Sequence, residues 1–236
     1  MEVEKSCLLI GNSRWHWAER VSDEWNFVHT CPDPARFQSL ENNLVAWASV
    51  GSVPSQICLA QNRRMVLEQV PLRNMPSWLG IDRALGAWGA LSRVKKSGRE
   101  CPGLIVADAG TILSLTRVMV DGEFRGGQLA PGLRLQLSSM EHGTESLSDP
   151  GLVSLDNDLF PYVTADAMRR GSLQSLLGML MEAQRQAAMP LWLCGGDSSV
   201  LFEALRYTGI EVAHFPDLVL EGMVDVYEMI NQDQGR

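Results

Sequence analysis

The sequence lacks the features that mark disulfide-bonded, zinc-binding and membrane proteins. Its five cysteines are scattered and contain no CxxC pair, which argues against a disulfide framework or a cysteine zinc site. Its four histidines have no metal-ligand spacing. The apolar run after Met1–Lys5 is too short for a signal peptide or a membrane span. We therefore expect a cytoplasmic protein that does not contact membranes.

Positive charge is also scarce, because 20 Lys and Arg residues face 28 Asp and Glu residues, for a net charge of −8. A general nucleic-acid binder needs a positive field, so we expect no nucleic-acid partner. The phosphate-binding loop GxxxxGK[ST] is absent as well. Apolar residues make up 45% of the 236 residues, which is enough to bury a core without disulfides.

One pattern occurs twice: a buried strand, a glycine turn, a return strand and a third strand. The strands expected in the first half are Cys7–Ile10, Arg14–Glu19 and Trp25–Val28, and those in the second half are Leu104–Ala107, Ile112–Val120 and Glu123–Leu129. The pattern predicts an α/β protein of two lobes, residues 1–102 and 103–236. Each lobe would carry a mixed sheet with flanking helices, and the two would face a central cleft.

Helical periodicity indicates further elements between and after these strands. Helices are predicted at Pro34–Trp47, Pro76–Val94 and Thr164–Ala187, after Asp197 and from Asp217, and strands at Ile57–Ala60, Met65–Leu67, Leu191–Cys194 and near Val212.

Two glycine turns have the composition of phosphate-binding turns. Gly11-Asn12-Ser13 and Asp108-Ala109-Gly110-Thr111 each follow a buried strand. Glycine lets backbone approach a ligand closely, hydroxyl groups contact phosphate, and an aspartate can hold a cation. Each turn alone also fits an ordinary hairpin turn.

Three further segments carry possible site residues. Asp82 beside Arg83 pairs a possible base with an anion clamp, although a solvated pair at a helix start fits equally well. Gly126–Gly132 fits a wall of a substrate site or a structural loop. Gly195–Asp197 fits a nucleotide contact or a plain strand-to-helix turn.

Taken in order, these motifs resemble the type III pantothenate kinases, which have an actin-like (ribonuclease H-like) fold. The family carries DxGN[TS], GxDR, DxGTAxT, GGxIxPG, NTxxAxxxG and TGGD. Here these motifs stand as Leu9–Ser13, Gly80–Arg83, Asp108–Ser114, Gly126–Gly132, Val163–Gly171 and Cys194–Asp197.

The resemblance implies a homodimeric enzyme that transfers a phosphoryl group from ATP to pantothenate, the first step of coenzyme A synthesis. Asp82 would be the base, and pantothenate would bind at Gly80, Ile81, Asp82, Arg83 and Thr164. ATP would bind at Gly11, Asn12, Ser13 and Thr111 with Mg²⁺, and Asp108 would hold a monovalent cation, K⁺ or NH₄⁺.

The chain also departs from the family pattern. Leu9 replaces the first acidic residue, Val163 and Cys194 replace an asparagine and a threonine, and Pro71–Trp78 contains no counterpart of the substrate-contacting tyrosine. Two alternatives therefore stand beside the kinase: a non-catalytic regulatory protein on this fold, which Leu9 favours, and a kinase with another small-molecule acceptor.

Overall fold

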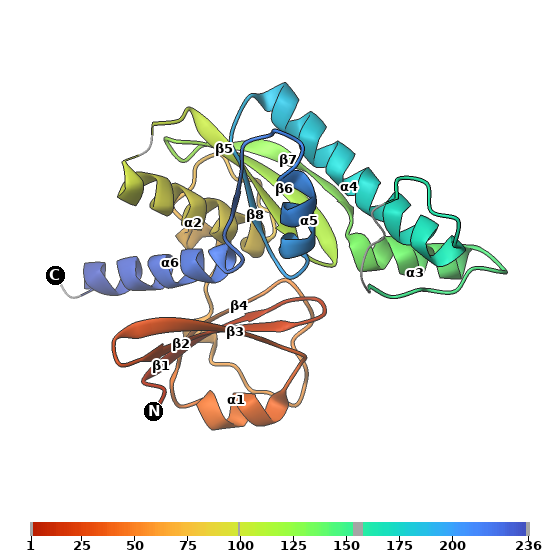
Figure 1. Cartoon of the computed structure of the whole chain (residues 1–236). Helices are drawn as coiled ribbons and strands as arrows, with labels where there is room; N and C mark the ends of the chain where they lie inside the picture. Colours follow the sequence, from red (N-terminus) through yellow and green to blue (C-terminus); the bar gives the residue numbers. More distant parts are fainter. Residues whose placement is uncertain (1, 99, 153–157, 235–236) are drawn as a thin grey trace. The chain divides into compact units, whose positions relative to one another are not determined.

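The computed structural model describes residues 2–98, 100–152 and 158–234. By its internal contacts the chain divides into two compact units (Figure 1). The first consists of Met1–Glu100, Met119–Phe124 and Asp217–Arg236, and the second of Cys101–Val118 and Arg125–Pro216. The predicted lobe boundary at residues 102 and 103 stays a prediction, because these units are assembled from interleaved segments.

The first unit contains a four-stranded mixed sheet in the order β3-β2-β1-β4. Its strands are β1 (Lys5–Ile10), β2 (Trp15–Val21), β3 (Glu24–Thr30) and β4 (Leu44–Ser49). Strands β1 to β3 pair antiparallel, and β4 pairs parallel to β1. The register places Ile10 opposite Trp15 and Leu9 opposite His16, so the chain reverses tightly through residues 11–14.

Helix α1 (Pro34–Leu40) covers one face of this sheet. The Asp33 carboxylate caps it by accepting a hydrogen bond from the Arg36 amide at 3.0 Å, and Pro34 opens it with a preset φ. The core beneath α1 contains side chains from alternate positions of the strands. Its members include Leu8, Ile10, Trp15, Trp17, Phe37 and Trp47.

Helices α2 (Ile81–Ser97) and α6 (Leu218–Gln234) pack against each other in the first unit, and α6 also contacts β1 and β2. Glycines permit the close crossing: a Cβ at Gly222 would clash with the Leu85 carbonyl oxygen, and one at Gly89 with that of Leu218. Arg93 forms a salt bridge with Glu221 along the same crossing.

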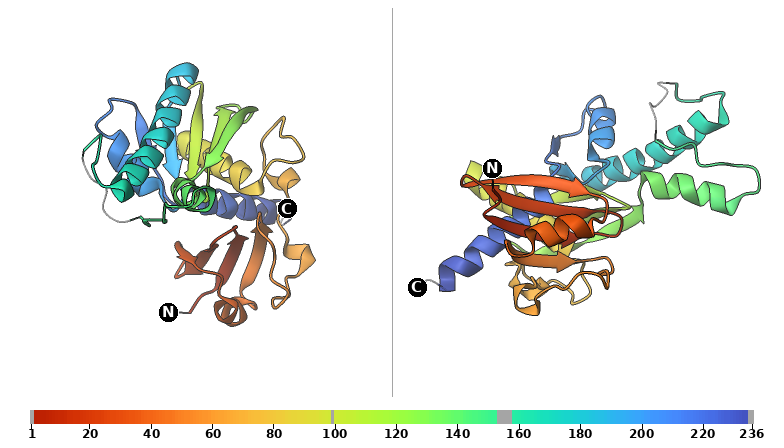
Figure 2. Two further views of the ribbon diagram at one scale, coloured as in Figure 1. Left: turned by 90° about the vertical axis from the view of Figure 1, so that its right-hand side faces the viewer. Right: turned by 90° about the horizontal axis from the view of Figure 1, so that it is seen from below.

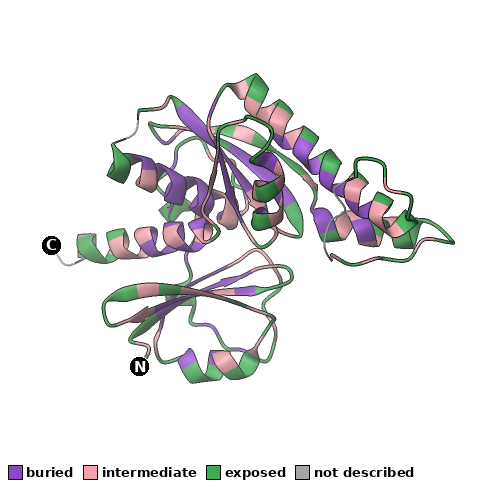
Figure 3. Ribbon diagram, in the orientation of Figure 1, coloured by how far each residue is buried: buried purple, intermediate pink, exposed green. Residues whose placement is uncertain are grey.

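The second unit contains a five-stranded sheet in the order β7-β6-β5-β8-β9. Its elements are β5 (Gly103–Ala109), β6 (Ile112–Met119), β7 (Phe124–Pro131), α3 (Leu133–Gly143), α4 (Thr164–Ala187), β8 (Leu191–Cys194), α5 (Ser198–Leu205) and β9 (Val212–His214). Strands β5 and β8 are parallel and almost fully buried (Figure 3). Both views of Figure 2 show α3 beside the first half of α4.

The repeated sheet pattern predicted from the sequence is confirmed. In both sheets the first strand lies next to the return strand, which in turn lies next to the third strand. On its other side the first strand pairs with a later, parallel strand, so the orders are β3-β2-β1-β4 and β7-β6-β5-β8. The predicted helix at Thr164–Ala187 and strand at Leu191–Cys194 have the bounds found in the structure.

Two predictions of local structure were wrong. The helix predicted over Pro34–Trp47 ends at Leu40, and Leu44–Ser49 is strand β4, because pairing with β1 outweighs an apolar spacing that fits either element. The strands predicted at 57–60 and 65–67 belong to an irregular loop that contains the short 3₁₀ helices Gln61–Arg63 and Leu67–Gln69. This loop is anchored by the Trp47 indole, which donates to the Ala60 carbonyl at 2.8 Å.

Within the described residues, no helix is both long and apolar enough to cross a membrane. All five cysteines are free thiols. Burial raises the pKa of Cys7 in β1 to about 12. This thiol is therefore a packing residue of the core and not a nucleophile.

Candidate active site

The glycine turn after β1 is held against the end of β4. The Gly11 amide donates to the Arg14 carbonyl at 3.0 Å, which closes the turn. The amides of Val50 and Gly51 donate to the Ile10 carbonyl at 3.0 and 3.2 Å. A Cβ at Gly51 would clash with the Gly11 carbonyl oxygen, so only glycine fits there. The side chains of Asn12 and Ser13 remain exposed beside this rigid backbone.

Helix α2 begins next to the end of β4. Its N-cap is Gly80, where a Cβ would lie 2.5 Å from the Asp82 carboxylate and 4.0 Å from Cγ1 of Val50. The segment Val50–Gly51 therefore contacts both Gly11 and Gly80. The structure thus brings the predicted phosphate turn and the predicted base onto one edge of the first unit, and it shows Gly51 as a site residue that the sequence analysis missed.

Asp82 is a half-buried carboxylate in the first turn of α2. Its Oδ1 accepts a hydrogen bond from the Arg83 amide at 2.8 Å. Burial raises the pKa of Asp82, and the bond from the Arg83 amide opposes that rise in part. A raised pKa makes a carboxylate a stronger proton acceptor, which suits a general base.

Arg83 is the adjacent cation. Burial lowers the pKa of its guanidinium, and the Asp82 carboxylate acts in the opposite direction. An arginine stays protonated through such shifts, so the position supplies a fixed positive charge for an anionic substrate.

Three predicted motifs converge in the second unit. The Asp108 carboxylate at the end of β5 lies against Gly195, which has a φ of +88° and no room for a Cβ. The Asp197 amide donates to the Ala109 carbonyl at 2.9 Å, and the Gly132 amide donates to the Thr111 carbonyl at 2.9 Å. The Asp108–Thr111 turn is thereby held between Gly132 on one side and Gly195–Asp197 on the other.

The surroundings of this second turn are charged. Arg134, in the first turn of α3, lies 3.5 Å from the Asp197 carboxylate. Asp197 belongs to the Gly195–Asp197 segment that was predicted from the sequence, whereas Arg134 was not identified there. Thr111 is exposed and Asp108 is half-buried, so solvent reaches both residues.

The remaining predicted site residues lie as follows. Thr164 is the exposed first residue of α4, in the second unit, whereas Gly80–Arg83 belong to the first. Leu9 is 4% exposed and packs on the α6 side of the sheet. In the described part of the chain, no group of three His, Cys, Asp or Glu side chains could hold a metal ion.

Two β-sheets built on the same plan, each with a glycine turn after its first strand, define an actin-like fold of the sugar-kinase type. A protein of the Campylobacter jejuni Baf family has this fold, with a TM-score of 0.63 at 20% identity over 96% of this chain and 99% of its own. A Sinorhizobium meliloti protein assigned as a 2-dehydro-3-deoxygalactonokinase has it too, with a TM-score of 0.56 at 11% identity over 96% and 99%.

The family model described as type III pantothenate kinase matches residues 38–186. A type III pantothenate kinase of Synechococcus sp. strain JA-3-3Ab is 32% identical over 224 residues, covering 91% of this chain and 88% of that protein. The chain belongs to the type III pantothenate kinase family.

Proposed function

We propose that this protein is a working pantothenate kinase that transfers the γ-phosphoryl group of ATP to the primary hydroxyl of pantothenate. The observation that carries the proposal is the intact pair Asp82–Arg83 at the start of α2, in a chain whose family relationship covers most of its length. Pantothenate would bind at Gly80–Arg83 and Thr164, with Arg83 on its carboxylate.

Asp82 takes the proton from the attacking hydroxyl as the oxygen–phosphorus bond forms. The bond between the γ-phosphorus and the bridging oxygen breaks, and ADP leaves with that oxygen. Phosphoryl transfer of this kind is catalysed mainly by positioning and charge stabilisation. The Asn12 and Ser13 groups and the Thr111 hydroxyl would supply the hydrogen-bond donors toward the ATP phosphates. Gly11, whose amide closes the turn on the Arg14 carbonyl, would let the backbone approach them closely.

The residues fit a metal that arrives with the nucleotide. Mg²⁺ usually keeps several waters and binds through substrate phosphates and only one or two carboxylates, so it needs no preformed cluster. When bound, it would neutralise phosphate charge. We assign Asp108 to a monovalent cation, K⁺ or NH₄⁺, because its half-buried carboxylate stands at the end of β5 against Gly195, where an acidic oxygen can bind a cation.

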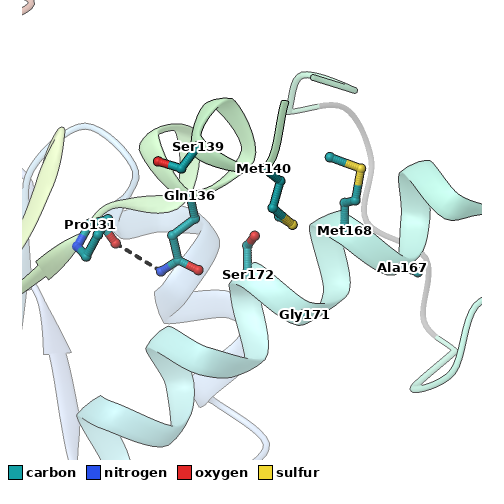
Figure 4. Close-up of a pocket in the computed structure, with 8 residues that line it drawn as sticks. All are labelled: Pro131, Gln136, Ser139, Met140, Ala167, Met168, Gly171 and Ser172. Carbon is teal, nitrogen blue, oxygen red and sulfur yellow. Dashed lines mark hydrogen bonds between the residues drawn. The ribbon is translucent and has the colours of Figure 1, made fainter. Parts of the chain in front are cut away.

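A homodimer is part of the proposal. Four large apolar side chains just before and at the start of α4 are exposed, namely Leu159, Phe160, Tyr162 and Val163. The neighbouring face of α4 carries Ala167 and Gly171 beside a cavity of about 330 Å³ between α3 and α4 (Figure 4). The buried Ser172 hydroxyl borders this cavity and has no hydrogen-bond partner within the described chain. A second copy would cover these groups.

The non-catalytic alternative is not favoured. The likeness to a Baf family protein is one of fold at 20% identity, and a fold does not define a function. Leu9 stands where the family pattern has an acidic residue. The other proposed site residues of the pattern are present, namely Asp82, Arg83, Asp108 and Thr111. A different acceptor is not favoured either, because the chain belongs to the type III pantothenate kinases. The cytoplasmic location stays a prediction.

The test is ADP release by the purified protein with ATP, Mg²⁺, K⁺ and pantothenate. We expect release that depends on pantothenate, falls about 10²- to 10⁴-fold in Asp82→Asn, and falls steeply when Na⁺ replaces K⁺. Asp82→Asn should still bind ATP. Release without pantothenate dependence would exclude this acceptor, and an unaffected Asp82→Asn would exclude the base.

A further inference from the structure

Three titratable side chains form a hydrogen-bonded row in the first unit that the proposed mechanism does not use. The Asp217 carboxylate, immediately before α6, lies 2.7 Å from Nε2 of His29 in β3. The Nδ1 atom of His29 lies 2.7 Å from Nδ1 of His16 in β2. The residues are 13 and 188 positions apart in sequence, and the sheet and the start of α6 bring them together.

The chemistry of the row fixes where its protons lie. An ionised carboxylate only accepts, so His29 donates from Nε2 to Asp217. A neutral His29 then accepts at Nδ1, and His16 must donate from its own Nδ1. The outer atom of the row, Nε2 of His16, is therefore a hydrogen-bond acceptor when both rings are neutral.

One added proton reverses that polarity. If Nε2 of His16 takes up a proton, its Nδ1 proton passes to Nδ1 of His29. His29 then becomes an imidazolium paired with the Asp217 carboxylate, and Nε2 of His16 is a donor. The added positive charge then lies on His29, next to Asp217, and Nε2 of His16 carries an N–H at the other end of the row.

That other end opens on the phosphate turn. A Cβ at Gly11 would lie only 3.1 Å from Nε2 of His16. The directly paired residue on β1 is Leu9, which is uncharged. His16 is therefore the titratable side chain on this face of the β1–β2 hairpin nearest the Gly11 backbone.

The surroundings of His16 disfavour its protonated form when no ligand is bound. Burial, together with His29 on β3 and Arg14 in the turn, lowers the pKa of His16 to about 4, while Asp217 before α6 acts in the opposite direction. A multiply charged phosphate at the turn would favour the protonated form, as any nearby opposite charge does.

We propose that His16, backed by His29 and Asp217, takes up a proton when a nucleotide phosphate binds at Gly11–Ser13 and then donates a hydrogen bond to that phosphate. His16 is thereby a positioning residue for the nucleotide. The inference rests on the proposed assignment of this turn to ATP. The proton comes from the buffer, and no other bond is made or broken.

The test is isothermal titration calorimetry, in which the protein is titrated with the Mg²⁺ complex of a non-hydrolysable ATP analogue. The titration is repeated in buffers of different ionisation enthalpy. We expect the wild type to take up between a few tenths of a proton and one proton at pH 7.5. Its Kd should rise by up to tenfold per pH unit between pH 6.5 and 8.5, since binding that takes up protons weakens as they become scarce.

The variants His16→Gln and His29→Gln should bind several-fold more weakly, with no proton uptake and a flat pH dependence. His142→Gln, which removes an exposed histidine of α3, is the matched control and should behave as wild type. Circular dichroism confirms that each variant is folded.

The outcomes separate the two proposals. If the wild type binds the nucleotide without buffer-dependent heat, the proposed proton uptake by His16 is wrong, while the assignment of the turn to ATP is unaffected. Proton uptake that survives in His16→Gln also overturns the proposed proton uptake by His16. No binding of the nucleotide by the wild type overturns the proposed function itself.

Discussion

At the scale of single residues, Asp82 combines a catalytic assignment with an energetic cost. Its carboxylate is partly removed from water, and the amide of Arg83 compensates only in part. Burying a charge without a full set of partners costs free energy, and active sites commonly carry such costs. Asp82 is therefore a position where activity and stability should respond to mutation in opposite directions.

We expect wild-type kcat/KM to fall as the pH drops through the raised pKa of Asp82, at a higher pH than the ordinary value of about 4 would give. Protonated Asp82 is the better-tolerated form in the fold, so its contribution to stability is lost as the pH rises through that pKa. Asp82→Asn should therefore have a higher Tm than wild type at pH 7.5, while it loses turnover.

A pH–rate profile and thermal unfolding of both proteins check this prediction. Asn is close in shape to Asp, so packing is conserved in the comparison. An acid limb near pH 4 together with a lower Tm for Asp82→Asn would show that burial does not govern this carboxylate.

At the scale of elements, the crossing of α2 and α6 sets the position of the Asp82 helix. Gly89 and Gly222 let the two backbones meet, and the pairs Arg93–Glu221 and Lys96–Asp225 lie alongside. Added volume at such a contact forces the backbones apart, at a typical cost of about 1–3 kcal/mol.

We expect Gly222→Ala to lower the free energy of unfolding by about 1–3 kcal/mol, because the new Cβ meets the Leu85 carbonyl. Gly178→Ala is the matched control: it lies inside α4, where a Cβ meets nothing within 4 Å. That variant should gain up to about 1 kcal/mol from helix propensity. Urea unfolding of both variants measures the difference, and equal stabilities would show that the crossing can relax.

Much of the element plan could be predicted from the sequence, since Trp15 and Trp17 alternate as a half-buried strand does and glycine turns separate the strands. The identity of Leu44–Ser49 could not, because its apolar spacing fits a helix, and only its neighbour β1 makes it a strand. Gly51 is missed for the same reason: its importance comes from contact with Gly11, 40 positions earlier.

The candidate site divides in the same way. Asp82, Arg83 and the two turns are local patterns that can be read along the chain. The row of His16, His29 and Asp217 has no spacing signal, because it is formed by strand register and by a helix that returns from the far end of the sequence.

At the scale of the whole molecule, the exposed apolar segment before α4 is the strongest indication of assembly. Phe160 is 81% exposed and Tyr162 fully exposed. Residues of this kind are enriched at protein interfaces, where they bury large areas.

We expect the wild type to sediment as a dimer, and the double variant Phe160→Ser, Tyr162→Ser to sediment as a monomer with a raised KM for pantothenate. Tyr207→Ser, which removes another strongly exposed tyrosine, after α5 in the same unit, should leave the dimer intact. Analytical ultracentrifugation with parallel kinetics checks this, and a wild-type monomer with full activity would contradict it.

The interleaving of the two units has a consequence for the order in which the protein can fold on the ribosome. The sheet of β1–β4 and helix α2 are synthesised before the second unit, but α6, which packs on both, is synthesised after it. At about 5–20 residues per second, residues 101–216 delay that helix by on the order of ten seconds. During this interval the surface of β1, β2 and α2 that α6 covers stays exposed, and the first unit cannot complete its packing until α6 has been synthesised.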